Sequence, residues 1–142
     1  MKKRNKMNLA KASLLVLIST FTFMACSSEE PLSVTDEAFL LLEGSWGLGS
    51  IQLDGVDQSA NYPGFELTFT STGYSASSGG SLFTSGSWEW MDDNASVISL
   101  IDGKDLNLIT LTEKDLVFTF TLNDGGAASG ISGNYRIALV KL

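Results

Sequence analysis

The stretch that decides the fold is Leu116-Val117-Phe118-Thr119-Phe120-Thr121-Leu122, in which apolar side chains larger than their neighbours occupy every second position. A period of two places alternate side chains on opposite faces of a β-strand, so this segment has one face suited to a core. The same alternation recurs through Phe65, Leu67 and Phe69, and through Tyr135, Ile137 and Leu139. We therefore predict a chain built mainly from half-buried strands.

Turn-forming Asp, Asn, Gly and Ser residues divide the chain into eight such segments. We place them at residues 45–54, 64–71, 73–77, 83–91, 96–101, 105–111, 116–123 and 131–140. Many short strands at a spacing of about ten residues are typical of all-β sandwiches and barrels. We predict one all-β domain, an eight-stranded antiparallel up-and-down barrel.

The connections between these segments differ in length and composition. If the strands run up and down in order, alternate connections lie at opposite ends of the barrel. One end receives the segments 55–63, 78–82, 102–104 and 124–130, most of which are long and rich in Gly and Ser. The other end receives only the short connections 72, 92–95 and 112–115. This asymmetry predicts a barrel with an open mouth and a closed base.

One short helix is expected before the first strand. Thr35 is a candidate N-cap, and Asp36 and Glu37 follow in the first turn, where acidic side chains favour the helix dipole. Residues 38–42 supply an apolar face, and Gly44 ends the helix. Because this helix enters the first strand from the base side, we expect it to cap the closed end.

The N-terminal residues have the pattern of an export signal. Five basic residues lie in the first eleven positions, ahead of an apolar stretch that is too short to span a membrane. This segment ends at Ala25-Cys26, which resembles the lipobox of bacterial lipoproteins. The resemblance implies a signal peptide over residues 1–25, lipidation of Cys26 and a flexible tether over residues 26–34. An ordinary secretory signal with a chance cysteine is the alternative.

The tether also resembles a localisation signal. Its Ser27-Ser28-Glu29-Glu30 run resembles the acidic export signal of Bacteroidota lipoproteins. That resemblance implies a lipid-anchored protein of the outer membrane, exposed at the cell surface, with attachment facing the periplasm left open. Several acyl chains at about 0.8 kcal/mol per buried CH₂ would give durable anchoring.

Charge and composition exclude several classes of function. Removal of residues 1–25 leaves 4 basic and 16 acidic residues, a net charge of −12, which excludes nucleic acid as a partner. The sequence contains no His, so imidazole is excluded as a metal ligand or general base. Glu66 and Glu89 alternate with apolar residues and are expected to face solvent. We predict no enzyme, no cofactor and no metal site.

A tripeptide pattern recurs at the start of strands, as Gly44-Ser45-Trp46, Gly86-Ser87-Trp88 and Gly133-Asn134-Tyr135. The first copy, after a short helix, resembles the G-x-W signature of lipocalins and other calycins. Residues 35–142 are similar to the lipocalin-like domains of Bacteroidota lipoproteins. The resemblance implies that Trp46 packs across the closed base beneath an arginine of the last strand, for which Arg136 is the candidate. A compact fatty-acid-binding-like or avidin-like barrel remains the structural alternative.

Two functions from different classes stay open. The first is a barrel that binds or carries a small, largely apolar ligand, with aromatic side chains in its upper half or at its rim. These are Tyr62, Phe65, Phe83, Trp88, Phe120 and Tyr135. The second is a solid barrel, filled by its large inward side chains, that docks a protein partner through its Gly-rich loops. An internal cavity above about 300 Å³ would support the first, and a filled interior with an exposed apolar patch the second.

Overall fold

The computed structural model describes residues 29–79, 82–123 and 132–142. The chain separates into two units, residues 1–31 and residues 32–142. Of the first unit only residues 29–31 are described, and they are exposed and form no helix or strand. Cys26 lies outside the described residues. Within the described ranges, no helix is both long enough and apolar enough to cross a membrane.

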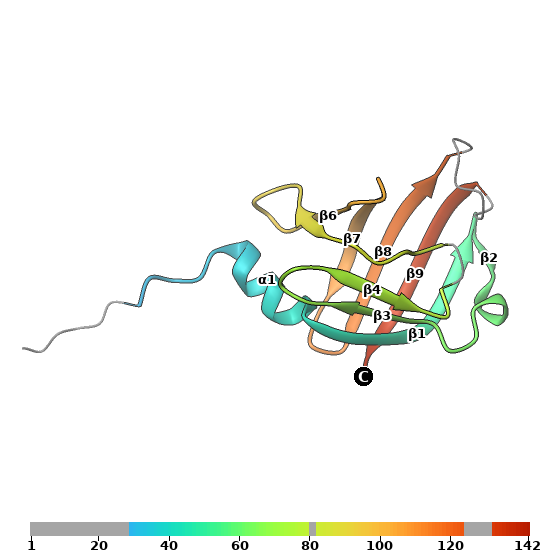
Figure 1. The fold of residues 1–142 in the computed structure, drawn as a ribbon, viewed down its shortest axis with the longest axis horizontal. Coiled ribbons are helices and arrows are strands. Elements are labelled where there is room, and N and C mark those ends of the chain that lie inside the picture. The colour runs from blue at the N-terminus through green and yellow to red at the C-terminus, as the bar shows by residue number, and fades with distance from the viewer. Residues whose placement is uncertain (1–28, 80–81, 124–131) are drawn as a thin grey trace, which may run out of the picture. The chain divides into compact units, whose positions relative to one another are not determined.

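The second unit contains one antiparallel sheet that curls into a barrel (Figure 1). Its strands are β1 (Gly44–Leu53), β2 (Val56–Asp57), β3 (Glu66–Phe69), β4 (Tyr74–Ser77), β5 (Trp88–Trp90), β6 (Val97–Leu100), β7 (Asp105–Leu111), β8 (Asp115–Leu122) and β9 (Gly133–Lys141). The sheet order is β4-β3-β1-β9-β8-β7-β6-β5, with the two-residue β2 paired to β1. Except for the pairing of the first and last strands, neighbours in the barrel are consecutive along the chain. The predicted eight-stranded up-and-down barrel is therefore confirmed.

The barrel is nearly closed at a seam between β4 and β5. In the described part of the chain, a single bridge joins these edges: the Tyr74 N–H donates to the Gly86 carbonyl at 2.7 Å, and the Gly86 N–H donates back at 3.0 Å. A Cβ on Gly73 would lie 2.7 Å from the same Gly86 oxygen, so the backbones approach too closely for a side chain there. The predicted strand 83–91 was too long, because the ladder starts only at Trp88.

The core lies inside the barrel, on the face that the alternation makes apolar. Large apolar side chains from all parts of the sheet are buried or pack against the buried cluster. They include Trp46, Leu48, Phe65, Leu67, Phe69, Tyr74, Trp88, Trp90, Phe118, Phe120, Tyr135 and Ile137. The alternation shifts once in β1, where a bulge between Leu48 and Ser50 brings Ile51 inside. Gly49 forms this bulge, and a Cβ there would lie 2.9 Å from the Ala138 carbonyl oxygen.

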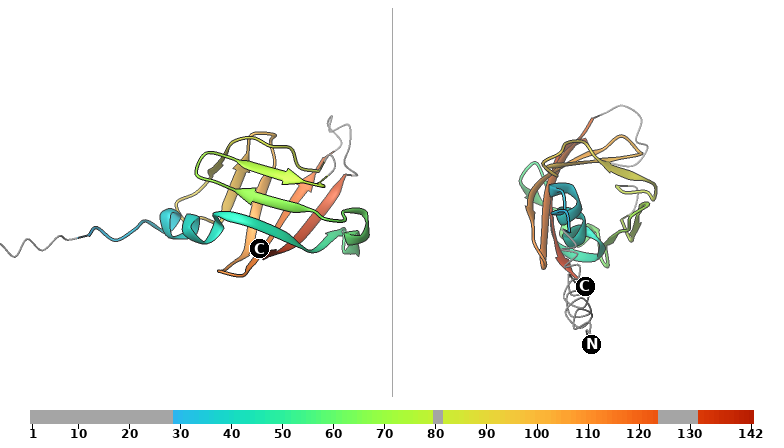
Figure 2. Two further views of the ribbon diagram at one scale, coloured as in Figure 1. Left: turned by 60° about the horizontal axis from the view of Figure 1, so that its bottom comes forward. Right: turned by 90° about the vertical axis from the view of Figure 1, so that its left-hand side faces the viewer.

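The helix α1 (Val34–Leu42) precedes β1 and lies at the predicted closed end, as Figure 2 shows in its view along the barrel. The Trp46 indole N–H donates to the Leu42 carbonyl at 2.8 Å and so ties the helix to the barrel. The predicted N-cap at Thr35 was wrong. Ser33 is the cap, because its hydroxyl accepts from the Asp36 N–H while the Asp36 carboxylate accepts from the Ser33 N–H.

Candidate functional site

Five of the six predicted ligand-binding residues meet at the Gly-rich end of the barrel. We call them the mouth cluster: Tyr62, Phe65, Phe83, Phe120 and Tyr135. Ring centroids are 5.7 Å apart between Phe65 and Phe83, 5.5 Å between Phe83 and Phe120, and 5.0 Å between Phe120 and Tyr135. The last pair is stacked, with an interplanar angle of 5°. Residues separated by up to 73 positions in the sequence thus form one aromatic group.

Strand register places the stacked pair, and the connections bring the other rings to it. Phe120 of β8 and Tyr135 of β9 are direct cross-strand partners and therefore stack on the inner face. Phe65 immediately precedes β3, and its carbonyl accepts from the Leu48 N–H at 3.1 Å. Tyr62 follows the short 3-10 helix η1 (Ser59–Asn61), which the sequence did not predict. Two residues of the cluster, Phe120 and Tyr135, therefore lie in strands, and the other three lie in the connections beside them.

Phe83 reaches the cluster from outside the sheet. It lies in the connection between β4 and β5, in a stretch that forms no strand, and its ring is 3% exposed. The adjacent Leu82 is buried as well. The Lys104 ammonium lies 5.7 Å from the Phe83 centroid and pairs with Asp102 at 2.6 Å. Leu82 and Phe83 thus close this end of the barrel, and we call them the plug.

Few polar groups accompany these rings. Burial raises the pKa of the Tyr135 hydroxyl, and the neighbouring Tyr62 hydroxyl and Asp54 carboxylate raise it further. The Asn134 backbone N–H donates to Asp54 Oδ1 at 2.9 Å and fixes that carboxylate beside the rim. An apolar group of rings with a small number of placed polar atoms is the usual composition of a small-molecule site.

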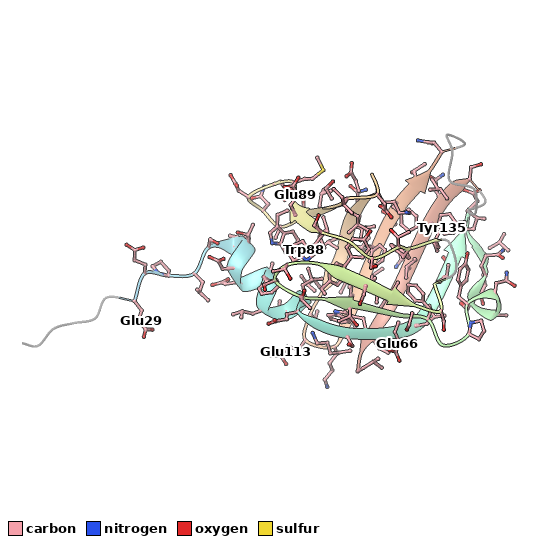
Figure 3. All side chains as sticks on the ribbon, viewed as in Figure 1. Glu29, Glu66, Trp88, Glu89, Glu113 and Tyr135 are labelled. Carbon is pink, nitrogen blue, oxygen red and sulfur yellow. The ribbon has the colours of Figure 1, made fainter. Side chains whose placement is uncertain are left out.

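Trp88, the sixth predicted residue, lies elsewhere. It stacks on Phe39 of α1 at 5.9 Å, meets Trp90 edge to face at 5.3 Å, and donates from its indole N–H to the Thr70 carbonyl at 2.9 Å. Figure 3 shows Trp88 beside α1 and Tyr135 at the other end of the barrel. The prediction that Trp88 belongs to the mouth was wrong, because β5 begins at Trp88 and the Gly86 bridge places this strand near the base.

The base is held by Trp46 and Lys141. Trp46 is fully buried, and the Lys141 ammonium lies 4.3 Å from its ring centroid. The same ammonium donates to the carbonyl of Leu41 at 3.1 Å and to that of Glu43. Burial lowers the pKa of Lys141, and the Glu43 carboxylate partly opposes that change. These contacts join the end of α1 to the last strand.

The predicted cation over Trp46 was therefore misidentified. Arg136 is exposed and lies opposite Gln52 and Thr119, on the outer face of the sheet. Lys141 shares the inward face of β9 with Tyr135, Ile137 and Leu139, so strand parity alone could have identified it. Gly44 fits the same arrangement, since it has φ of +118° and a Cβ there would lie 3.0 Å from the Lys141 nitrogen.

The acidic residues support turns and the outer surface. Glu66 and Glu89 are exposed, as predicted. The Ser59 N–H and hydroxyl donate to Asp57 Oδ1 and lower the pKa of that carboxyl, and Ser96 does the same for Asp92. In residues 29–79, 82–123 and 132–142, no three His, Cys, Asp or Glu residues are grouped so that they could hold a metal ion.

Of the surface hollows that the sequence did not predict, two bear on function. One is a polar groove of about 580 Å³ on the outer face, lined by residues that include Gln52, Asn107, Thr119 and Arg136 and that extend to Phe120 and Tyr135. The other is a smaller aromatic pocket beside α1, lined in part by Phe39 and Trp90. The outward polar positions of β1, β7, β8 and β9 were the available signal for the first. Comparison with protein-family models, curated proteins and solved structures found no match to this chain.

Proposed function

We propose that this protein is a lipocalin-like lipoprotein, anchored through Cys26 in the outer membrane, that binds a small, largely apolar ligand at the mouth of its barrel. The observation that carries the proposal is the mouth cluster, in which five aromatic side chains and two phenolic hydroxyls converge inside one end of the barrel. Aromatic surfaces with a few hydrogen-bonding groups suit a ligand that has an apolar body and a polar tip.

Ligand entry requires the plug to move. The rings of Phe65, Phe83, Phe120 and Tyr135 are at most 3% exposed, so the mouth is closed in this conformation. Leu82 and Phe83 belong to residues 82–87, which form no ladder in the structure apart from the bridge at Gly86. Segments with few backbone hydrogen bonds open at lower free energy than core strands. A ligand would therefore replace the Phe83 ring against Phe65 and Phe120 without breaking a strand pair.

A neutral apolar dye tests this mechanism. We would titrate N-phenyl-1-naphthylamine into the full chain carrying Cys26→Ser, which cannot be acylated, and follow dye fluorescence. Phe83→Ala should raise the dye affinity by about threefold or more, because the vacated ring volume joins the site. Ile98→Ala is the matched control, since it also removes a buried side chain, from β6 opposite Trp90, at the base.

The dye results distinguish the two candidate functions. Saturable binding that Phe83→Ala strengthens and Ile98→Ala leaves unchanged supports the mouth site. Equal effects of the two variants would mean that the dye only reports loosened packing. Absence of binding in all folded variants would favour the second candidate, a solid module that docks a protein partner. The closed mouth and the polar groove of about 580 Å³ outside the sheet are the observations that favour this alternative.

The anchor is tested separately. Cys26→Ser removes the only thiol in the sequence and, with it, the acylation site that the lipobox resemblance implies. We expect the wild-type protein to sediment with outer membranes and the variant to be lost from that fraction. Retention of the variant in the outer membrane would contradict the lipid anchor while leaving the mouth site untouched.

A further inference from the structure

A second aromatic group lies at the base of the barrel, beside α1. Phe39, Trp88 and Trp90 line a pocket of about 160 Å³ together with Thr35, Asp36 and Ser71. We call this hollow the base pocket. All three aromatic side chains are partly exposed, in contrast to the buried Phe65, Phe83, Phe120 and Tyr135 of the mouth.

The base pocket exists because the barrel does not close completely. The backbone bridge between Tyr74 and Gly86 is the link described across the seam, and Trp88 lies two residues beyond it, toward the base. There the Trp88 indole N–H donates to the Thr70 carbonyl at 2.9 Å. A side-chain hydrogen bond therefore joins the two edges in place of backbone pairing. Residues of helix α1 line the same hollow, and Phe39 stacks on Trp88. A fixed indole ring thus forms the centre of the pocket.

The three rings offer a favourable surface to a cation. The ring planes of Trp88 and Phe39 are 24° apart, and those of Trp88 and Trp90 are 87° apart. Rings in two nearly perpendicular orientations therefore line the same hollow. The face of an aromatic ring is electrostatically negative, and tryptophan binds cations best among the aromatic side chains. Several rings around one small space are the arrangement that recognises quaternary ammonium groups.

The charges point the same way. Asp36 is the only charged residue that lines the base pocket, and no Lys or Arg does. Within the described ranges, the hydrogen bonds made to the Asp36 carboxylate both come from Ser33 and both go to Oδ2, so Oδ1 remains available. The chain after residue 25 has 16 acidic and 4 basic residues, which also attracts cations and repels anions.

We propose that the base pocket binds a small organic cation, a quaternary or methylated ammonium group. Its volume of about 160 Å³ lies below the range of about 300–1,000 Å³ that drug-sized ligands occupy, which matches a small head group. The group could belong to a free solute or to a choline lipid. This site is independent of the mouth cluster and of the proposed apolar ligand.

Choline and its uncharged isostere separate charge from shape. We would titrate each into the full chain carrying Cys26→Ser, with tryptophan fluorescence and calorimetry as readouts. Choline should bind saturably and at least about tenfold more tightly than 3,3-dimethylbutan-1-ol, which has the same shape without the charge. Equal affinity for the two, or no saturable binding of choline, would overturn the proposal. Sedimentation with phosphatidylcholine rather than phosphatidylglycerol vesicles would assign the head group to a lipid, and binding of free choline alone would assign it to a solute.

Variants locate the site and control for folding. Trp90→Leu should weaken choline binding by about tenfold, and Asp36→Asn by about three- to tenfold. Glu89→Gln is the matched charge control, because Glu89 lies between the two tryptophans in sequence but on the exposed face. Ser33→Ala removes the helix cap and keeps the Asp36 carboxylate. If Ser33→Ala or Glu89→Gln lowered choline affinity as much as Asp36→Asn does, direct contact between choline and the Asp36 carboxylate would be contradicted. Choline should not displace the naphthylamine dye, so failure at one end of the barrel is distinguishable from failure at the other.

Discussion

Replacement of Lys141 by Met tests how the base of the barrel is held. The methionine side chain keeps most of the apolar volume of the lysine stem and removes its charge. Three contacts are lost: the ammonium over the Trp46 ring at 4.3 Å, and its hydrogen bonds to the Leu41 and Glu43 carbonyls. Those carbonyls lie at the C-terminal end of α1, where backbone carbonyls have no hydrogen-bond donor within the helix. The variant therefore disconnects helix and last strand without opening a large cavity.

The magnitude follows from these contacts. A cation over a partly desolvated indole contributes about 0.5–2 kcal/mol. A hydrogen bond from a charged donor contributes about 1.5–3 kcal/mol. Desolvation opposes both, since burial lowers the pKa of Lys141 and thus disfavours its charged form. We expect a net loss of about 2 kcal/mol, which corresponds to a fall of about 8 °C in Tm for a domain of this size.

Urea unfolding, followed by tryptophan fluorescence, measures the loss. Arg136→Met is the matched control, because it removes a positive charge from the same strand on the exposed face. An exposed substitution of this kind should change the free energy of unfolding by less than about 0.5 kcal/mol. A loss in Arg136→Met equal to that in Lys141→Met would refute the assignment of Lys141 as the cation over Trp46. If Lys141→Met left the free energy of unfolding unchanged, the desolvation cost of the ammonium would equal the energy of its contacts.

Two further predictions concern groups away from Lys141. Burial raises the pKa of Tyr135 above its ordinary value of 10.0. The stability linked to its protonated form is therefore complete below pH 10 and is lost as the pH rises through the folded-state pKa. Tyr135→Phe should reduce the fall in unfolding free energy above pH 10, measured by urea unfolding at a series of pH values. Gly44→Ala should cost more stability than Gly55→Ala in thermal unfolding, because both positions have positive φ but only the Gly44 Cβ would also crowd the Lys141 ammonium.

Most of the fold could be predicted from strand alternation. A period of two is a local property, and burial of one face is enough to make it visible. The inward residues of β3, β8 and β9 were therefore identified correctly, and the up-and-down order followed from the short connections. The same logic grouped Phe120 with Tyr135, because cross-strand partners on one face must touch.

Non-local register was beyond the reach of this reasoning. The height of Trp88 in the barrel depends on how β4 and β5 align across the seam, and one bridge at Gly86 sets that alignment. The helix cap at Ser33 was available as a Ser-x-x-Asp pattern, but Thr35 competes for the same role two residues later. Arg136 was chosen by resemblance where the parity of β9 favoured Lys141. In each case the competing local signals are nearly equal, and the tertiary contacts decide between them.

The construction of the two ends constrains what a mouth ligand must be. The base is fixed by the helix, by the Trp46 indole and by Lys141, whereas Leu82 and Phe83 close the mouth mainly by burial of their side chains. Exposing one large apolar side chain costs about 1.5–3 kcal/mol, so opening the plug costs about 3–6 kcal/mol. That cost reduces the apparent affinity of any ligand by about 10²- to 10⁴-fold. Only a ligand that buries as much apolar surface as the displaced Leu82 and Phe83 side chains can offset it, which favours ligands with an aromatic ring or a bulky branched chain.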